Sequence, residues 1–261
     1  MLHCDRHSAR SRRLPRDARV VRRASPHRVP RPFDDRGCEP LVGTPVVRAA
    51  LFDLDGTLVD SLPTIAEATV EAFTRHGHPV TVEAVLPRIG PPMEVVAREL
   101  TGVGPEESQA MYTSYQDLYY SEYIQRTPPH EGAHALIDAL STAGVALGIV
   151  TNKNEYGGRL MVTVQGWDGR FGSIVGRDTA AGPKPSPEAA LFALRVLNVS
   201  PSQAALVGDT EFDMNCGRDA GLAYVIGVTG ARTAAHLRAE GATHVVDTLM
   251  EAGSILLGGA A

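Results

Sequence analysis

Two aspartates directly follow an apolar run. The run extends from Val46 to Phe52, and Asp53 and Asp55 come next in the stretch LFDLDGTLVDS, residues 51–61. A carboxylate is costly to place beside a buried strand unless its charge is compensated. The pair therefore indicates a site that uses negative charge, as a metal ligand, a nucleophile or a general acid and base.

Further polar residues follow other apolar runs. Ligands of open parallel α/β sheets bind outside the carboxyl ends of the strands, so residues that follow different strands are expected to meet there. Lys153, next to this set in the sequence, is expected to point to solvent. The residues expected to meet are Asp53, Asp55, Thr151, Asn152, Lys184 of GPKPSPE, and Asp209 and Asp213 of GDTEFD.

Such a set suits phosphoryl transfer. Asp53, nearest the strand end, is able to attack phosphorus and form an aspartyl-phosphate. Asp55 is able to protonate the leaving oxygen and then to deprotonate the attacking water. Carboxylate oxygens are also the ligands that Mg²⁺ prefers, and a divalent ion removes the repulsion between clustered carboxylates.

The remaining polar residues have auxiliary roles in this chemistry. Thr151, Asn152 and Lys184 are expected to hold the phosphate oxygens, with Lys184 offsetting the developing negative charge. Asp209 is expected to hold the metal. Asp213 is expected to support the metal or to orient Lys184.

An α/β fold must position these residues. Short apolar runs alternate with longer amphipathic ones from Val46 onward, which is typical of a doubly wound, mainly parallel sheet with covering helices. The predicted strands are Val46–Leu54, Val145–Thr151, Ser173–Val175, Ala204–Val207, Ala223–Val228 and Thr243–Val246. The predicted helices are Ala133–Ala143, Tyr156–Gln165, Pro187–Leu197, Phe212–Ala220, Ala234–Ala239 and Thr248–Leu257.

One interval interrupts this alternation. Between the first two predicted strands, Leu62–His76, Met93–Leu100 and Glu106–Ile124 carry apolar residues at helical spacing, with no convincing strand. A βαβ crossover needs far fewer residues. The sequence therefore predicts an inserted helical cap over residues 62–128, with the catalytic core formed by residues 46–61 and 129–261.

These motifs resemble those of a known family. DLDGTLVDS, VTNK, the GPKPSPE lysine and GDTEFD, in this order, are similar to the four motifs of the haloacid dehalogenase-like superfamily, and most similar to its phosphoglycolate-phosphatase-like branch. The resemblance covers Val46 to about Ala252 and implies a Rossmann-like core. It also implies that Asp53 is the nucleophile and Asp55 the general acid and base. Mg²⁺ would be bound by Asp53, the backbone carbonyl of Asp55, and Asp209, with Asp213 beside them.

The resemblance also bears on substrate choice. Caps of this family close over the core, and the stretch RIGPP, residues 88–92, is similar to their substrate-facing loop. Arg88 or the Gly90 backbone is therefore expected to meet the non-phosphate end of a small phosphorylated metabolite. Phosphoglycolate is the expected substrate, while nucleoside monophosphates, pyrophosphate and sugar phosphates stay open.

Several alternatives remain. A β-phosphoglucomutase-like phosphomutase would use the same motifs, and a phosphate-binding regulatory protein would have lost turnover. A haloacid dehalogenase is disfavoured because that reaction needs no Mg²⁺ cluster. His130–His134 reads HEGAH, the spacing of a zinc-protease motif, but Pro129 before it and Gly132 inside it disfavour the helix that the motif requires.

Composition narrows the class of protein further. Residues 1–45 hold eleven arginines and five acidic residues, a net charge of +6 within a total of −5, so the rest carries −11. The Arg- and Pro-rich stretch 1–45 is predicted to be disordered, and the acidic remainder disfavours nucleic-acid binding. No apolar run is long enough to span a membrane. Three separated cysteines favour the cytoplasm, and a monomer or homodimer is expected.

Overall fold

Six parallel strands form one sheet in the part of the chain that the structure describes. A computed structural model describes residues 46–179 and 182–258, so the stretch 1–45, predicted to be disordered, lies outside it. The strand order is β3-β2-β1-β4-β5-β6, which confirms the predicted α/β class. The strands are β1 (Ala49–Phe52), β2 (Ala146–Val150), β3 (Ser173–Val175), β4 (Ala204–Gly208), β5 (Tyr224–Val228) and β6 (His244–Val246).

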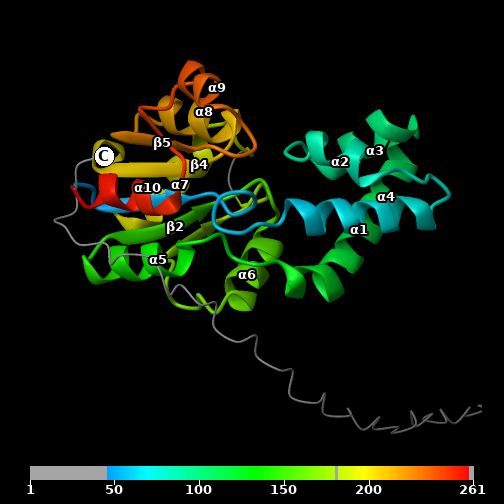
Figure 1. Ribbon diagram of the computed structural model, residues 1–261, viewed down its shortest axis with the longest axis horizontal. Helices are drawn as coiled ribbons and strands as arrows, with labels where there is room; N and C mark the ends of the chain where they lie inside the picture. Colours follow the sequence, from blue (N-terminus) through cyan, green and yellow to red (C-terminus); the bar gives the residue numbers. More distant parts are fainter. Residues whose placement is uncertain (1–45, 180–181, 259–261) are drawn as a thin grey trace, which may run out of the picture. The chain divides into compact units, whose positions relative to one another are not determined.

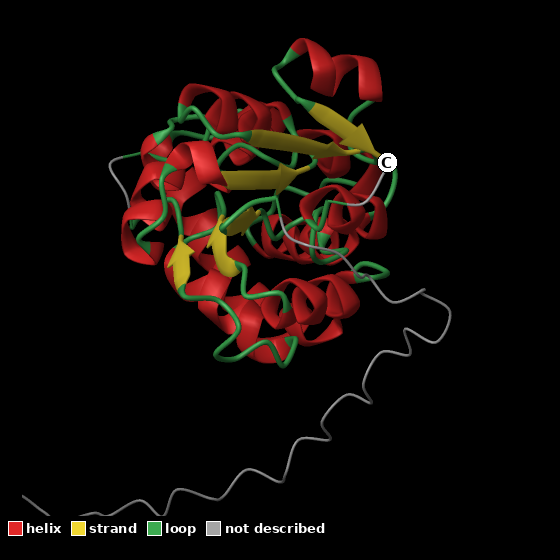
Figure 2. Cartoon of the chain, turned by 90° about the vertical axis from the view of Figure 1, so that its left-hand side faces the viewer, coloured by secondary structure: helices red, strands yellow, loops and turns green. Residues whose placement is uncertain are grey.

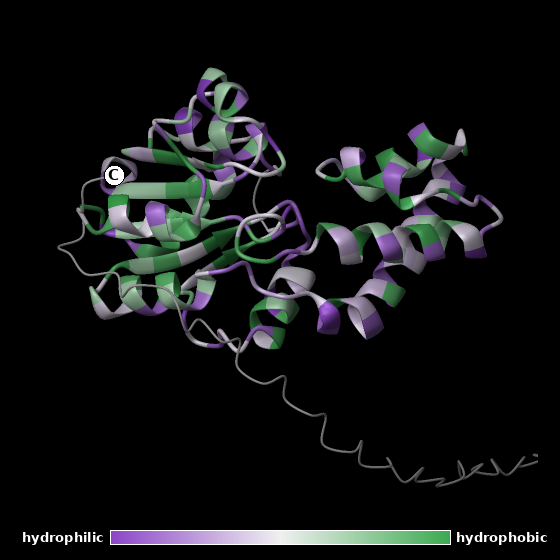
Figure 3. Ribbon diagram, viewed as in Figure 1, coloured by the Kyte–Doolittle hydropathy of each residue, from purple (hydrophilic) through white to green (hydrophobic). Residues whose placement is uncertain are grey.

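The central strand shows why the sequence forms this sheet. All four residues of β1 are fully buried, and Phe52 pairs with Ile149 of β2 and with Val207 of β4. Successive side chains point to opposite faces, so Phe52 joins one apolar cluster and Leu51 the other. Both faces of the sheet are covered, as parallel sheets require. Figure 2 shows the strands lying between helices, and Figure 3 shows that the strands are largely hydrophobic.

Helices cover each face. One apolar cluster contains residues of α5 (Ala133–Thr142), α6 (Glu155–Val164) and α10 (Leu249–Leu256). The other contains residues of α7 (Glu188–Leu197), α8 (Glu211–Asp219) and α9 (Ala234–Ala239). Figure 1 shows this arrangement around the sheet. The helices lie within one residue of the predicted bounds at either end.

The described residues between β1 and α5 form helices and turns. The helices are α1 (Leu62–Arg75), α2 (Val82–Val85), α3 (Met93–Thr101) and α4 (Pro105–Leu118), and single turns cover 86–88 and 119–126. The stretch from Glu106 to Ile124, expected to be helical, consists of α4 and, from Tyr119, a wider π-helical turn. We call Leu62–Arg126 the cap segment; its status as a separate subdomain stays a prediction.

The strand order fixes where a ligand site lies. From β1 the chain proceeds outward through β2 and β3, then returns to place β4 on the other side of β1. Such a switch point leaves a crevice at the carboxyl ends of the two strands, where ligands of this fold class bind. Asp53 follows β1 and Asp209 follows β4. Within the described residues, no helix combines the length and hydropathy needed to cross a bilayer.

Candidate active site

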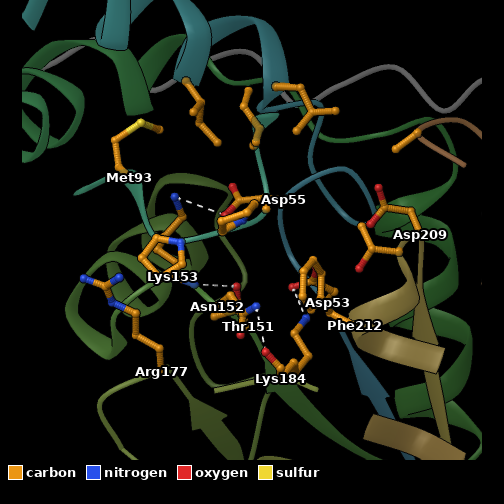
Figure 4. Close-up of a pocket in the computed structure, with 18 of the residues that line it drawn as sticks. Asp53, Asp55, Met93, Thr151, Asn152, Lys153, Arg177, Lys184, Asp209 and Phe212 are labelled. Carbon is orange, nitrogen blue, oxygen red and sulfur yellow. Dashed lines mark hydrogen bonds and ion pairs between the residues drawn. The ribbon is translucent and has the colours of Figure 1, made fainter. Parts of the chain in front are cut away.

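A cavity of about 230 Å³ lies at this edge of the sheet. It is lined by residues of the core loops and of the cap segment, and Figure 4 shows the polar side chains converging on it. The structure therefore brings together residues that lie far apart in the sequence. The predicted site residues that line the cavity are Asp53, Asp55, Thr151, Asn152, Lys184 and Asp209.

Asp53 forms part of a buried ionic cluster. Lys184 Nζ lies 2.9 Å from Asp53 Oδ1 and 2.6 Å from Asp213 Oδ1, and all three side chains are at least nine-tenths buried. Burial raises the pKa of Asp53 to about 7, although Lys184 opposes the shift. Burial lowers the pKa of Lys184, but the two carboxylates raise it more, so the net shift is upward and the ammonium stays charged.

Asp209 completes an acidic cluster suited to a cation. One oxygen each of Asp53, Asp209 and Asp213 lies within 4.8 Å of the others. Burial, followed by the charge of Asp213, raises the pKa of Asp209 well above its usual value. Lys184 supplies one positive charge against these three carboxylates. The donor set therefore fits a hard divalent cation such as Mg²⁺, whose charge would compensate the remaining negative charge.

A glycine allows the close approach of the first motif to Asp209. Gly56 has a φ of +84°, and a Cβ at this position would lie 2.5 Å from Asp209 Oδ2. Next to it, the Thr57 hydroxyl donates a 3.0 Å hydrogen bond to Asp209 Oδ1. The sequence DGT thus holds the carboxylate that follows β4 against the loop that follows β1.

Asp55 is held by two side chains. Ser61 donates to Asp55 Oδ1 at 2.7 Å, and Lys153 Nζ lies 3.1 Å from Asp55 Oδ2. The expectation that Lys153 points to solvent was wrong: its side chain is 6% exposed and lies 4.5 Å from the centre of the Tyr119 ring. The ion pair and the aromatic ring compensate for burial of the ammonium, so Lys153 belongs to the site.

Asp213 lies behind the cavity. It is fully buried on the first turn of α8. Its Oδ2 accepts hydrogen bonds from the Thr210 backbone N–H (3.1 Å) and hydroxyl (2.7 Å), while its Oδ1 faces Lys184. Because both oxygens have partners, the geometry supports the second of the two roles expected for Asp213, which was to orient Lys184.

Thr151 and Asn152 follow β2. The Thr151 side-chain oxygen accepts from the Lys153 backbone N–H at 3.2 Å, and the Asn152 amide donates to the Lys184 carbonyl at 3.2 Å. Asn152 Oδ1 is buried with no partner among the described residues. The amide thus ties the β2 loop to the Lys184 loop across the cavity.

The sequence placed Arg88 wrongly and missed two other arginines. Arg88 is exposed, donates to the Ala84 carbonyl at 2.7 Å and does not line the cavity, whereas Gly90 does. Arg88 comes four residues after Ala84, and this spacing lets its side chain reach back to the carbonyl of the preceding turn. Arg177 and Arg232 line the cavity without having been predicted. Their sequence signal was only their position after a strand.

The HEGAH stretch has a structural role. Helix α5 begins at Ala133 after Gly132, so His130 lies outside the helix that a zinc-protease motif requires. His134 Nδ1 accepts a hydrogen bond from the Trp167 indole at 2.9 Å. The two histidines therefore do not share a helix face.

Comparisons with known proteins agree with this geometry. The family model described as haloacid dehalogenase-like hydrolase matches residues 50–227. The chain belongs to this family of hydrolases. Within the family it resembles the phosphoglycolate phosphatases: that of Xylella fastidiosa (strain 9a5c) is 32% identical over 71% of this chain and 82% of its own length.

Other relatives carry different names. The pyrophosphatase PpaX of Bacillus velezensis is 32% identical over 67% of this chain and 80% of its own length. Among solved structures, a haloacid dehalogenase-like family hydrolase from Streptococcus pneumoniae has a TM-score of 0.72 at 25% identity, covering 80% of this chain and 98% of that one. The family and the fold are thus shared, while the named activities differ.

Proposed function

We propose that the protein is a Mg²⁺-dependent phosphatase that hydrolyses a small, phosphoglycolate-like phosphomonoester through an aspartyl-phosphate on Asp53. The observation that carries the proposal is the Asp53 carboxylate at the switch point of the sheet, beside a buried lysine and within a cluster of carboxylates. Asp53, Asp209 and the backbone carbonyl of Asp55 would hold Mg²⁺. When bound, this ion supplies positive charge that offsets the negative charge of the phosphoryl group.

In the first step, an oxygen of Asp53 attacks phosphorus as the ester P–O bond breaks. Asp55 gives its proton to the leaving oxygen, so the leaving group departs as an alcohol. Ser61 and Lys153 hold the Asp55 carboxyl in place for this transfer. Lys184 lies against Asp53, where its charge stabilises the negative charge on the phosphoryl oxygens, and Thr151 and Asn152 hold those oxygens.

In the second step, water attacks phosphorus of the aspartyl-phosphate. Asp55, now ionised, takes a proton from this water, the Asp53–phosphorus bond breaks, and inorganic phosphate is released. Asp53 regains its carboxylate and Asp55 its proton, so one water is consumed in each cycle. The cap segment is suited to limiting the entry of other nucleophiles, since it forms part of the cavity wall.

The substrate is proposed from two sources. The relatives named phosphoglycolate phosphatase favour phosphoglycolate, and the relative named pyrophosphatase makes pyrophosphate a second candidate. Both compounds are small enough for a cavity of about 230 Å³. A cytoplasmic location and a monomeric or homodimeric state stay predictions.

A phosphate-release assay tests this proposal. The purified chain is incubated with phosphoglycolate, pyrophosphate, a nucleoside monophosphate and a hexose phosphate, with and without Mg²⁺. We expect Mg²⁺-dependent release from one or more small esters, with phosphoglycolate preferred. Isomerisation of the hexose phosphate without release would support a phosphomutase instead. No Mg²⁺-dependent turnover of any compound would contradict the proposal.

A further inference from the structure

Arg177 is an unpredicted cation at the cavity, on the stretch 176–179 that follows β3. It follows β3, and its backbone N–H donates to the Lys153 carbonyl at 3.0 Å. In the same loop, the Gly176 N–H donates to the Thr179 hydroxyl at 3.1 Å, and this hydroxyl donates to Glu155 at 2.9 Å. The backbone of Arg177 is thus fastened to the core, so the position of its side chain does not depend on a loose segment.

The strand order places Arg177 away from the nucleophile. β3 is separated from β1 by β2, so the loop of Arg177 begins two strand spacings, roughly 10 Å, from that of Asp53. Figure 4 shows Asp53 and Lys184 toward one side of the cavity and Arg177 toward the other, with Thr151 and Asn152 between them. Arg177 therefore lies on the side of the cavity away from Asp53, where it is able to meet a part of the substrate other than the transferred phosphoryl group.

The cations of the cavity differ in how fully they are paired. Among the described residues, the cations that line it are Lys153, Arg177, Lys184 and Arg232. The other three each have a carboxylate oxygen at 3.1 Å or less. For Arg177 the nearest is Glu94 Oε1 at 3.5 Å, and its side-chain hydrogen bond goes to the Tyr112 hydroxyl at 2.8 Å. A guanidinium has five N–H donors, so Arg177 keeps capacity for a further acceptor.

Glu94, the partner of Arg177 in the cap segment, also lacks a full set of hydrogen-bond partners. Glu94 Oε2 is buried with no hydrogen-bond partner among the described residues. The Arg177–Glu94 pair thus has neither the bidentate geometry nor the short distance of a strong arginine–carboxylate contact. A carboxylate or phosphate that entered the cavity would offer Arg177 two acceptor oxygens, whereas Glu94 offers a single oxygen at 3.5 Å.

From this geometry we propose that Arg177 determines specificity by binding a second negatively charged group on the leaving-group part of the substrate. This inference rests on the proposed phosphatase function. The shared chemistry is an anionic leaving group, either the carboxylate of phosphoglycolate or the second phosphate of pyrophosphate. Arg177 takes the place that the sequence suggested for Arg88, and Glu94 acts against it by repelling the same anion.

Two variants with opposite expected effects test the proposal. The substrates are phosphoglycolate, pyrophosphate and 2-hydroxyethyl phosphate, which replaces the carboxylate of phosphoglycolate by a neutral hydroxymethyl group. Arg177→Gln is expected to raise the KM for the anionic substrate by about 10- to 100-fold, the usual worth of a hydrogen bond to a charged group. The KM for 2-hydroxyethyl phosphate should change by less than about 3-fold. Glu94→Gln should lower the KM for the anionic substrate.

The choice of substrates shows which anionic group Arg177 binds. A KM effect on phosphoglycolate identifies the carboxylate as the bound anion, and an effect confined to pyrophosphate identifies the phosphate. Arg126→Gln removes an exposed arginine that pairs with Glu67 at 3.0 Å, and serves as the matched control with unchanged kinetics. Tyr112→Phe removes the hydrogen bond to Arg177 but leaves the positive charge of Arg177 in place. This variant should change the KM for charged and neutral substrates equally.

Three results would overturn the inference. If Arg177→Gln impairs phosphoglycolate, pyrophosphate and 2-hydroxyethyl phosphate to the same extent, Arg177 only fastens the cap segment to the core, and the proposed phosphatase function stands. If Glu94→Gln raises the KM for the anionic substrate, Glu94 assists binding and the inference is wrong. If the unmodified protein releases no phosphate from any of the three, the proposed function fails and this inference fails with it.

Discussion

The core and the cap segment contribute opposite kinds of side chain to the same cavity. In the described part of the chain, every charged residue that lines it comes from the core, whereas the cap segment contributes aliphatic residues, a methionine, a glycine, prolines and tyrosines. The core side chains follow strands, as Asp53, Lys153 and Asp209 do. The cap residues lie on helices and on the turn from Leu86 to Met93.

This difference indicates a division of labour. Strand ends are rigid, and the pairing of β1 with β2 and β4 fixes the distances that charge stabilisation requires. Helices joined by turns present an apolar wall whose shape depends on side-chain size. Changes at the ends of β1, β2 and β4 are therefore expected to alter the rate of reaction, whereas changes in the cap segment, and at Arg177 after β3, are expected to alter the choice of substrate.

The largest expected effect comes from the nucleophile. Asp53→Asn keeps the shape of the side chain but removes the charge that attacks phosphorus, so kcat should fall by about 10⁴-fold or more. Phosphate release under single-turnover conditions measures it, and circular dichroism checks that the fold is kept. Retention of more than a tenth of the activity would show that the reaction does not pass through Asp53.

Removal of the metal should come close to this effect. Chelation with EDTA is expected to lower phosphate release by about 10³-fold or more, because clustered carboxylates without a cation repel the phosphate. Added Mg²⁺ should restore the rate. Activity that persists in EDTA would assign another role to the Asp53, Asp209 and Asp213 cluster.

The lysine of the core should have the next largest effect. Lys184→Gln is expected to lower kcat about 100-fold, since it removes the charge beside Asp53 and leaves Asp213 without its partner. Arg195→Gln, at an exposed arginine of α7, is the control. A change in KM alone would show that Lys184 contributes to binding and not to the reaction.

A cap substitution should act on a different parameter. Ile89→Ala shortens an apolar side chain of the cavity wall and should change the KM by about 10-fold at most, with kcat within about 2-fold. The sign is expected to depend on the substrate, with larger leaving groups favoured. Steady-state kinetics on phosphoglycolate and a hexose phosphate measure it. An equal loss of kcat for both would contradict the division of labour.

Arg88 provides the smallest expected change. Its side chain bonds to its own helical turn, and the residue is exposed, so Arg88→Gln should alter kcat and KM by less than about 2-fold. The same assay on phosphoglycolate measures it. A 10-fold rise in KM would show that Arg88 reaches the substrate, as its position in the sequence first suggested.

The core was predictable because its local signals agree. Buried parallel strands read as uninterrupted apolar runs, and β3 was found with its exact bounds because Ser173–Val175 is flanked by glycines. The polar residues that follow the strands were found for the same reason, since the topology brings all strand ends to one edge. The predicted residues that line the cavity come mainly from these positions.

The parts that were missed depend on packing between segments. Lys153 is buried against the Tyr119 ring of the cap segment, and this contact has no signal in the residues around either position. Residue type alone does not distinguish Arg88 from Arg177. The direction of the Arg88 side chain follows from the helical turn at Ala84, and that of Arg177 from the loop after β3. The four-residue helix Val82–Val85 is too short to show a period.

The two segments that connect the cap segment to the core, residues 58–60 and 128–130, lie side by side. Val59 forms a bridge with Pro129, the Asp60 N–H donates to the Pro128 carbonyl, and the His130 N–H donates to the Leu58 carbonyl. Residues 62–126 thus leave and re-enter at neighbouring points, so another segment with closely spaced ends is expected to replace them without disturbing the sheet. A chimera joined at residues 58–60 and 128–130 would exchange the part of the substrate selectivity that the cap segment provides, which thermal unfolding and a substrate panel would reveal.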